Sequence, residues 1–163
     1  MKQAPETPIT TPPHRRRTAK SRWQGVDVLE YKKQTDAPFL DVTRQVLFDD
    51  PALASQLRYF EVAPGGHTTL ERHEHAHAVV VHRGAGRCLI GDRVYALSEH
   101  DLVHVPALTW HQFRADDDAP LGFLCMVNAV RDRPQLPSAD DIEKMCETPV
   151  VAAFLAPRDR DGG

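Results

Sequence analysis

The sequence predicts an all-β domain, and three observations support this prediction. Short apolar runs recur from Trp23 to Asn128, many at a spacing of about 8–12 residues, which is typical of a β-sandwich or barrel. Clusters of Gly, Pro and Asp separate these runs and are typical of turns. The chain has 163 residues, which is enough for one sizeable core but little for two.

The strands are expected in the order of the apolar runs. They are predicted at Val26–Tyr31, Val42–Phe48, Leu57–Ala63, Ala78–His82, Cys88–Ile90, Val94–Leu97, Leu102–Val105, Gln112–Arg114 and Leu121–Val127. A short helical turn is expected at Pro51–Gln56. The barrel domain is therefore predicted over residues 25–130.

Both ends of the chain differ from this β pattern. Residues 1–24 are rich in Pro, Thr and Arg and predict a disordered tail. Residues 131–163 predict a helical extension with a frayed end, Arg158–Gly163. Its helix begins after the cap residue Ser138 and ends at Pro149. The short apolar piece Val150–Leu155 is expected to pack on the barrel.

Charge and composition exclude several classes of protein. The formal net charge is -3, although residues 1–25 carry six positive charges and one negative charge. The folded part shows no basic face with interleaved aromatic residues, so nucleic-acid binding is not expected. The sequence has no apolar run of about 20 residues, so a membrane helix is not expected. Three widely spaced cysteines fit a reducing cytoplasm better than a disulfide scaffold.

Histidines are concentrated in the centre of the chain. Eight of the nine histidines lie between His67 and His111. Glu71, His73, His75 and His77 are each two residues apart, so a strand would place all four on one face. Imidazole and carboxylate groups suit Fe, Ni, Mn, Cu or Zn. The residues therefore predict a site for one divalent transition metal.

The same stretch resembles the cupin superfamily. The first cupin motif, G-x5-H-x-H-x3/4-E-x6-G, has the spacing of Gly65, Glu71, His73, His77 and Gly84. The second motif, G-x5-P-x-G-x2-H-x3-N, is matched at its proline and its histidine by Pro106 and His111. The resemblance covers about residues 57–127 and implies a jelly-roll (double-stranded β-helix) barrel, of the kind found in small single-domain cupin_2-like proteins.

The resemblance implies a metal held by Glu71, His73, His77 and His111. Glu71 stands where the family has a histidine, and His77 where it has a glutamate, so the donor set is kept with two positions exchanged. An alternative set is His73, His75 and His111 without Glu71. The second motif also departs from the family at His100, Leu108 and Ala115, which are turn and structural positions.

Three further residues are candidates near the predicted metal. His75 is expected to hold a ligand or the substrate by hydrogen bonding. Trp110 precedes His111 and could cover the opening, and we count both as candidate catalytic residues. Cys125 is expected to be a small buried hydrophobe, with a substrate-contacting or redox-active thiol as the alternative.

The expected function is that of a metal-dependent dioxygenase acting on a small molecule, because cupins with a similar donor set resemble such enzymes. The alternatives are a Lewis-acid isomerase or lyase, and a non-enzymatic module that binds a metal or a small ligand. Unpaired strand edges at the open side of the barrel predict a homodimer.

Overall fold

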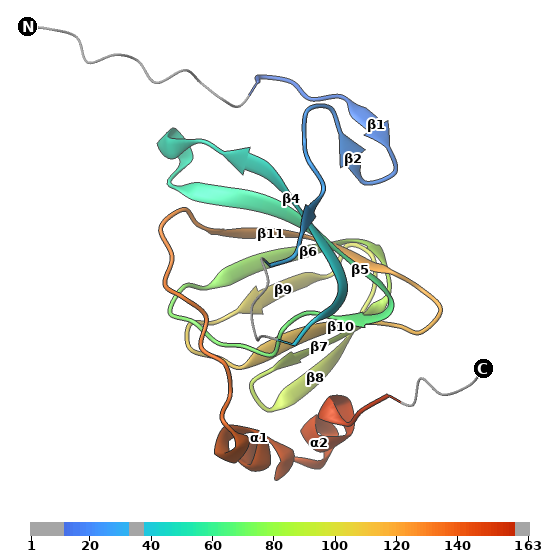
Figure 1. Ribbon diagram of the computed structural model, residues 1–163, viewed down its shortest axis with the longest axis vertical. Helices are drawn as coiled ribbons and strands as arrows, with labels where there is room; N and C mark the ends of the chain where they lie inside the picture. Colours follow the sequence, from blue (N-terminus) through green and yellow to red (C-terminus); the bar gives the residue numbers. More distant parts are fainter. Residues whose placement is uncertain (1–11, 33–37, 159–163) are drawn as a thin grey trace, which may run out of the picture.

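One curled antiparallel sheet dominates the molecule, as Figure 1 shows for the computed structural model. The structure describes residues 12–32 and 38–158. Nine strands form this sheet, with β8-β7-β10-β5-β11-β6-β9 as its main path and β4 joining β3 to β5. The predicted all-β barrel is confirmed.

The strands follow the predicted apolar runs closely but extend several of them. Their bounds are β3 Leu29–Glu30, β4 Leu40–Asp49, β5 Ser55–His67, β6 His77–Gly84, β7 Gly86–Ile90, β8 Arg93–Leu97, β9 Leu102–Val105, β10 His111–Ala115 and β11 Leu121–Asn128. The turn expected at Pro51–Gln56 is a short 3-10 helix, η1 Pro51–Leu53, between β4 and β5.

Alternate residues of the central strands fill the barrel. Strand β11 lies between β5 and β6, with Phe123 opposite Phe60 and Cys125 opposite both Arg58 and Val79. Because side chains alternate between the faces of a strand, these residues point into the interior together. The buried core includes Phe60, Val62, Val79, Val81, Phe113, Phe123, Cys125 and Val127. Polar residues at some of these inward positions therefore face the interior.

The segment predicted as a disordered tail includes a small hairpin. Residues 1–11 of that segment lie outside the described residues, but β1 Arg17–Ala19 and β2 Arg22–Trp23 pair with each other. Ser21 in the turn is buried, and its carbonyl accepts a hydrogen bond from Gln45 Nε2 at 2.9 Å. Trp23 packs edge-on against Tyr59, with ring centroids 5.5 Å apart. The hairpin depends on these contacts with β4 and β5, which local composition does not reveal.

Two short helices follow the barrel instead of the single helix expected. Helix α1, Ala139–Cys146, begins at a capping box between Ser138 and Asp141. Pro149 does not simply end this helix. It starts α2, Pro149–Leu155, because proline is well suited to the first turn of a helix. Helix α2 buries Val151 and Phe154 against Leu89 of β7, so the apolar piece packs on the barrel as expected. Residues 159–163 of the predicted frayed end lie outside the described residues.

No helix in the described part of the chain is long and apolar enough to cross a membrane. The predicted homodimer and the predicted cytoplasmic location are not tested by this structure and stay predictions.

Candidate metal centre

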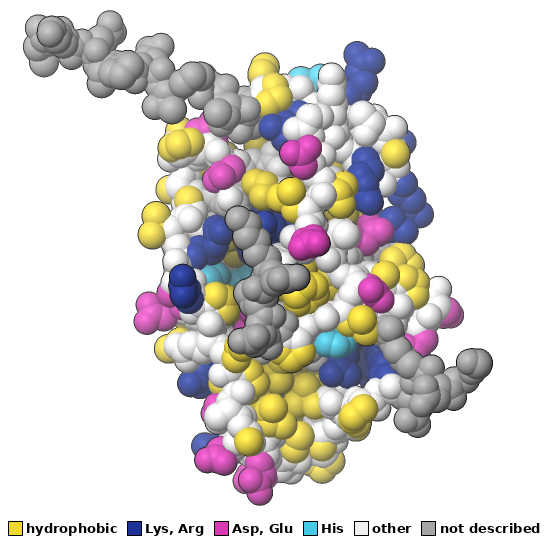
Figure 2. Space-filling model, viewed as in Figure 1, with side chains coloured by type: hydrophobic (Ala, Val, Ile, Leu, Met, Phe, Trp, Pro, Cys, Tyr) yellow, Lys and Arg dark blue, Asp and Glu magenta, His cyan; other side chains and the backbone are white. Residues whose placement is uncertain are grey.

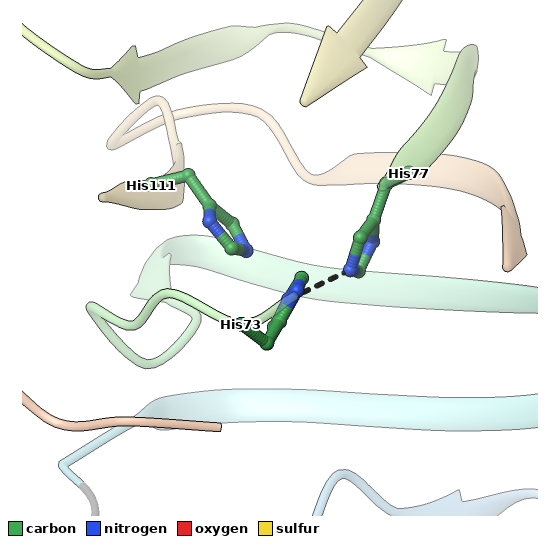
Figure 3. Close-up of side chains that lie close together, drawn as sticks. All are labelled: His73, His77 and His111. Atoms are coloured by element: carbon green, nitrogen blue, oxygen red, sulfur yellow. Dashed lines mark hydrogen bonds between the residues drawn. The ribbon is translucent and has the colours of Figure 1, made fainter. Parts of the chain in front are cut away.

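Three imidazole rings meet at one end of the barrel interior. His73 lies in the loop before β6, His77 is the first residue of β6, and His111 is the first residue of β10. One ligand atom from each lies within 4.8 Å of the others, and Figure 3 shows the three rings turned toward one another. The Nε2 atoms of His73 and His77 are 2.8 Å apart. The loop before β6, the start of β6 and the start of β10 thus each bring one imidazole to the same point.

The opposite nitrogen of each ring has a partner of its own. Nδ1 of His73 donates to the carbonyl of His75 at 2.7 Å, and Nδ1 of His111 donates to the carbonyl of Thr109 at 2.9 Å. Nδ1 of His77 lies 3.0 Å from Sγ of Cys125. A carbonyl can only accept, so neutral His73 and His111 have their lone pairs on Nε2. These are the outer hydrogen bonds that orient histidine ligands, and the three residues fit a metal.

Burial keeps the three imidazoles neutral. Burial is the main cause that lowers the pKa of His73 to about 4, and the neighbouring His111 and His75 add to it. Burial, again reinforced by the other histidines, holds the pKa of His77 far below its usual range. The pKa of His111 is also lowered, chiefly by burial. Because a protonated imidazole cannot bind a metal, this neutral state favours coordination.

Glu71 does not belong to this cluster of potential metal ligands. The segment before β6 is not a continuous strand, and Glu71 forms an isolated bridge with His111 through both backbone hydrogen bonds. Its buried carboxylate forms a salt bridge with Lys32. The segment is therefore not the strand that was assumed, although Glu71, His73, His75 and His77 all line one cavity. Glu71 lines the same cavity, and its role as a ligand stays a prediction.

His75 and Trp110 have different surroundings. The ring of His75 stacks on that of His73, with centroids 3.7 Å apart, and its Nδ1 donates to Asp132 at 2.7 Å. His75 therefore lies beside the cluster, as expected for a pocket residue. The ring of Trp110 packs under the guanidinium of Arg72, with 4.4 Å between that group and the ring centroid. Trp110 is not among the described residues that line the cavity, and its catalytic role stays a prediction.

The histidines open into a cavity of about 200 Å³. Cys125 is buried in the core, as expected, and it also lines this cavity. Figure 2 shows one small patch of histidine surface at the left of this face, with Lys and Arg side chains next to it. Several lining residues were not singled out from the sequence, and these are Lys32, Arg44, Arg58, Arg131 and Asp132. They come from distant segments of the chain. Only Arg58 had a signal in the sequence, because it lies two residues before Phe60 on β5 and so shares its inward face.

Comparison with known proteins defines the family. The cupin domain model matches residues 58–127. The 1-methylthio-D-xylulose 5-phosphate methylsulfurylase of Rhodospirillum rubrum is 56% identical over 134 residues, which are 82% of this chain and 86% of that protein. The chain belongs to the cupin family. A cupin 2 conserved barrel domain protein from Rhodopseudomonas palustris is 55% identical and covers 86% of this cupin and 97% of its own chain, with a TM-score of 0.82.

A second crystal structure, a cupin-2 domain from Rhodospirillum rubrum, is 53% identical to this cupin with a TM-score of 0.79, covering 88% of this chain and 97% of that one. The expected cupin barrel is thus confirmed, and the histidine cluster is compatible with metal binding. The expected dioxygenase activity is not confirmed, because the curated relative is named for another type of enzyme.

Proposed function

We propose that this cupin is a metal-dependent enzyme that removes the methylthio group from a small phosphorylated keto sugar. One observation supports the proposal above all. Sγ of Cys125 lies in the cavity, 3.0 Å from His77 of the histidine cluster. The methylsulfurylase that is 56% identical to this chain is named for a sugar phosphate with a methylthio group at carbon 1. A thiol beside the histidine cluster fits the transfer of a methylthio group better than it fits the dioxygenase reaction first expected.

The three histidines would hold the metal through Nε2. Fe, Ni, Mn, Cu and Zn all accept imidazole, and a bound divalent ion would polarise a carbonyl or hydroxyl oxygen of the sugar. Coordination through Nε2 leaves the ring proton of neutral His77 on Nδ1. That N–H then donates to Sγ of Cys125 and favours its thiolate form. The described residues thus connect the metal centre to the thiol through one imidazole ring.

In this proposal, Cys125 accepts the methylthio group. Burial raises the pKa of the thiol, whereas Arg58, with Nη2 at 3.6 Å from Sγ, acts in the opposite direction. The thiolate would attack the methylthio sulfur, so that an S–S bond forms and the bond from sulfur to sugar carbon breaks. The electron pair of the broken bond stays on the carbon beside the keto group, where a proton replaces the sulfur. An external thiol would then release the methylthio group from Cys125 by disulfide exchange.

The test is a comparison of Cys125→Ser with Cys146→Ser. Cys146 ends α1 and does not line the cavity, so it is a matched control. Metal-loaded proteins are mixed with 1-methylthio-D-xylulose 5-phosphate, and intact-protein mass spectrometry follows the chain. We expect wild type and Cys146→Ser to gain one methylthio group in place of one hydrogen. Cys125→Ser should gain none and lose turnover by about a hundredfold or more.

Metal content is measured in parallel and should be the same in all three proteins. Full turnover by Cys125→Ser would show that this thiol is not the acceptor. If the wild-type protein releases no methylthio group from the sugar phosphate, the proposed function is wrong.

A further inference from the structure

We propose that Arg44, Arg58 and Arg131 form a subsite that binds the phosphate group of the substrate. The inference rests on the proposed function, because it assigns the phosphate of that sugar to a place in the same cavity. All three side chains line the cavity that contains the histidine cluster.

Three separate segments bring the arginines together. Arg58 lies on β5 opposite Cys125 of β11, and Arg44 lies on β4 opposite Phe60 of β5. Because Arg58 and Phe60 are two residues apart, both arginines belong to the inward face of the sheet. Arg131 follows β11, and its guanidinium donates to the carbonyl of Asn128 at 2.8 Å and to Gln56 Oε1 at 3.3 Å.

The two carboxylates that line the cavity, Glu71 and Asp132, interact with groups other than the three arginines. Glu71 forms its salt bridge with Lys32. Asp132 accepts hydrogen bonds from His75 Nδ1 and from the backbone N–H of Glu74, at 2.7 and 2.8 Å. Within residues 12–32 and 38–158, none of the salt bridges includes Arg44, Arg58 or Arg131. Among the described residues, Asp49 acts on Arg131 electrostatically, but none of the three arginines forms a salt bridge with a carboxylate.

Buried polar atoms of the cluster also lack partners. Nε of Arg44 and Nε of Arg58 are both buried and have no hydrogen-bond partner among the described residues. Burial lowers the pKa of Arg44 and of Arg131, and in both cases the charge of Arg58 adds to the effect. The three guanidiniums are therefore close enough to repel one another. Such an arrangement is costly unless an anion compensates it.

A phosphate monoester matches this deficit. Lys32 and the three arginines outnumber the two lining carboxylates by two charges. A phosphate ester carries about -1.5 to -2 charges at pH 7, and guanidinium groups bind it through paired N–H donors. Arg58 contacts Cys125, and Cys125 contacts His77. The subsite and the metal cluster thus adjoin within one cavity, as a small sugar phosphate requires.

Isothermal titration calorimetry of the metal-loaded full chain tests the subsite. The probes are D-xylulose 5-phosphate, which lacks the methylthio group, and inorganic phosphate, and they distinguish a sugar phosphate from free phosphate as the source of the anion. We expect each of Arg44→Gln, Arg58→Gln and Arg131→Gln to raise the Kd for D-xylulose 5-phosphate by about ten- to a hundredfold, because each loses a charge-assisted hydrogen bond. Arg93→Gln, at an exposed position on β8, removes the same charge outside the cavity and should change the Kd by less than about twofold.

Two further measurements keep the test decisive. Melting temperature and metal content show whether each variant is folded, and Arg44→Lys keeps the charge but loses the forked donors, so its Kd should lie between those of wild type and Arg44→Gln. Unchanged Kd values in the three glutamine variants, an equal loss in Arg93→Gln, or no binding of either probe by wild type would overturn the subsite. Methylthio release is scored separately. Phosphate binding that depends on the arginines, without methylthio release, would leave the subsite standing and refute only the proposed function.

Discussion

At the scale of single residues, the histidines decide whether this cupin holds a metal. His73→Ala and His111→Ala each remove one of three converging nitrogens, so we expect metal content to fall from about one equivalent per chain to near zero. His104→Ala is the matched control, because His104 is exposed on β9 and does not line the cavity. Elemental analysis of the purified proteins gives the answer. Full metal content in both cluster variants would refute the site.

At the scale of elements, the end of β6 requires a glycine. Gly84 has φ 76°, and a Cβ there would collide with the carbonyl oxygen of Pro120, which precedes β11. We expect Gly84→Ala to lower the free energy of unfolding by about 2 kcal/mol or more. Gly25 has a similar φ of 67° and open space around it, so Gly25→Ala should cost only the conformational strain, about 1 kcal/mol. Urea denaturation compares the two, and equal losses would show that the close approach is unimportant.

At the scale of the whole molecule, a bound metal would tie the barrel together. Its ligands come from the loop before β6, from β6 and from β10, so the ion should bind the folded chain and not the unfolded one. We expect a chelator to lower the melting temperature, and free metal at a hundred times its Kd to add about 2.7 kcal/mol of stability. Calorimetry with His77→Ala as the control should show no such shift. A wild-type protein that melts at one temperature with and without metal would contradict this.

The sequence predicted the elements well because they depend on local patterns. Alternation of apolar residues and clusters of turn residues located the strands from β4 to β11. The cap residue Ser138 located the start of α1. Sequence reasoning missed the hairpin β1–β2, because this hairpin depends on contacts of Ser21 and Trp23 with β4 and β5. It also missed helix α2, because a proline can stop one helix and equally start the next, as Pro149 does.

The sequence by itself predicted the cupin fold and a metal site, and its set of four candidate ligands contained His73, His77 and His111 together with Glu71. Only the tertiary structure decided which neighbours serve that site. It joined Glu71 to Lys32, turned Trp110 away toward Arg72, and set Cys125 against His77. It also gathered Arg44, Arg58 and Arg131 around the cavity. The physical reason is that these contacts join segments far apart in the sequence, and strand pairing and curvature, not local spacing, fix which side chains meet.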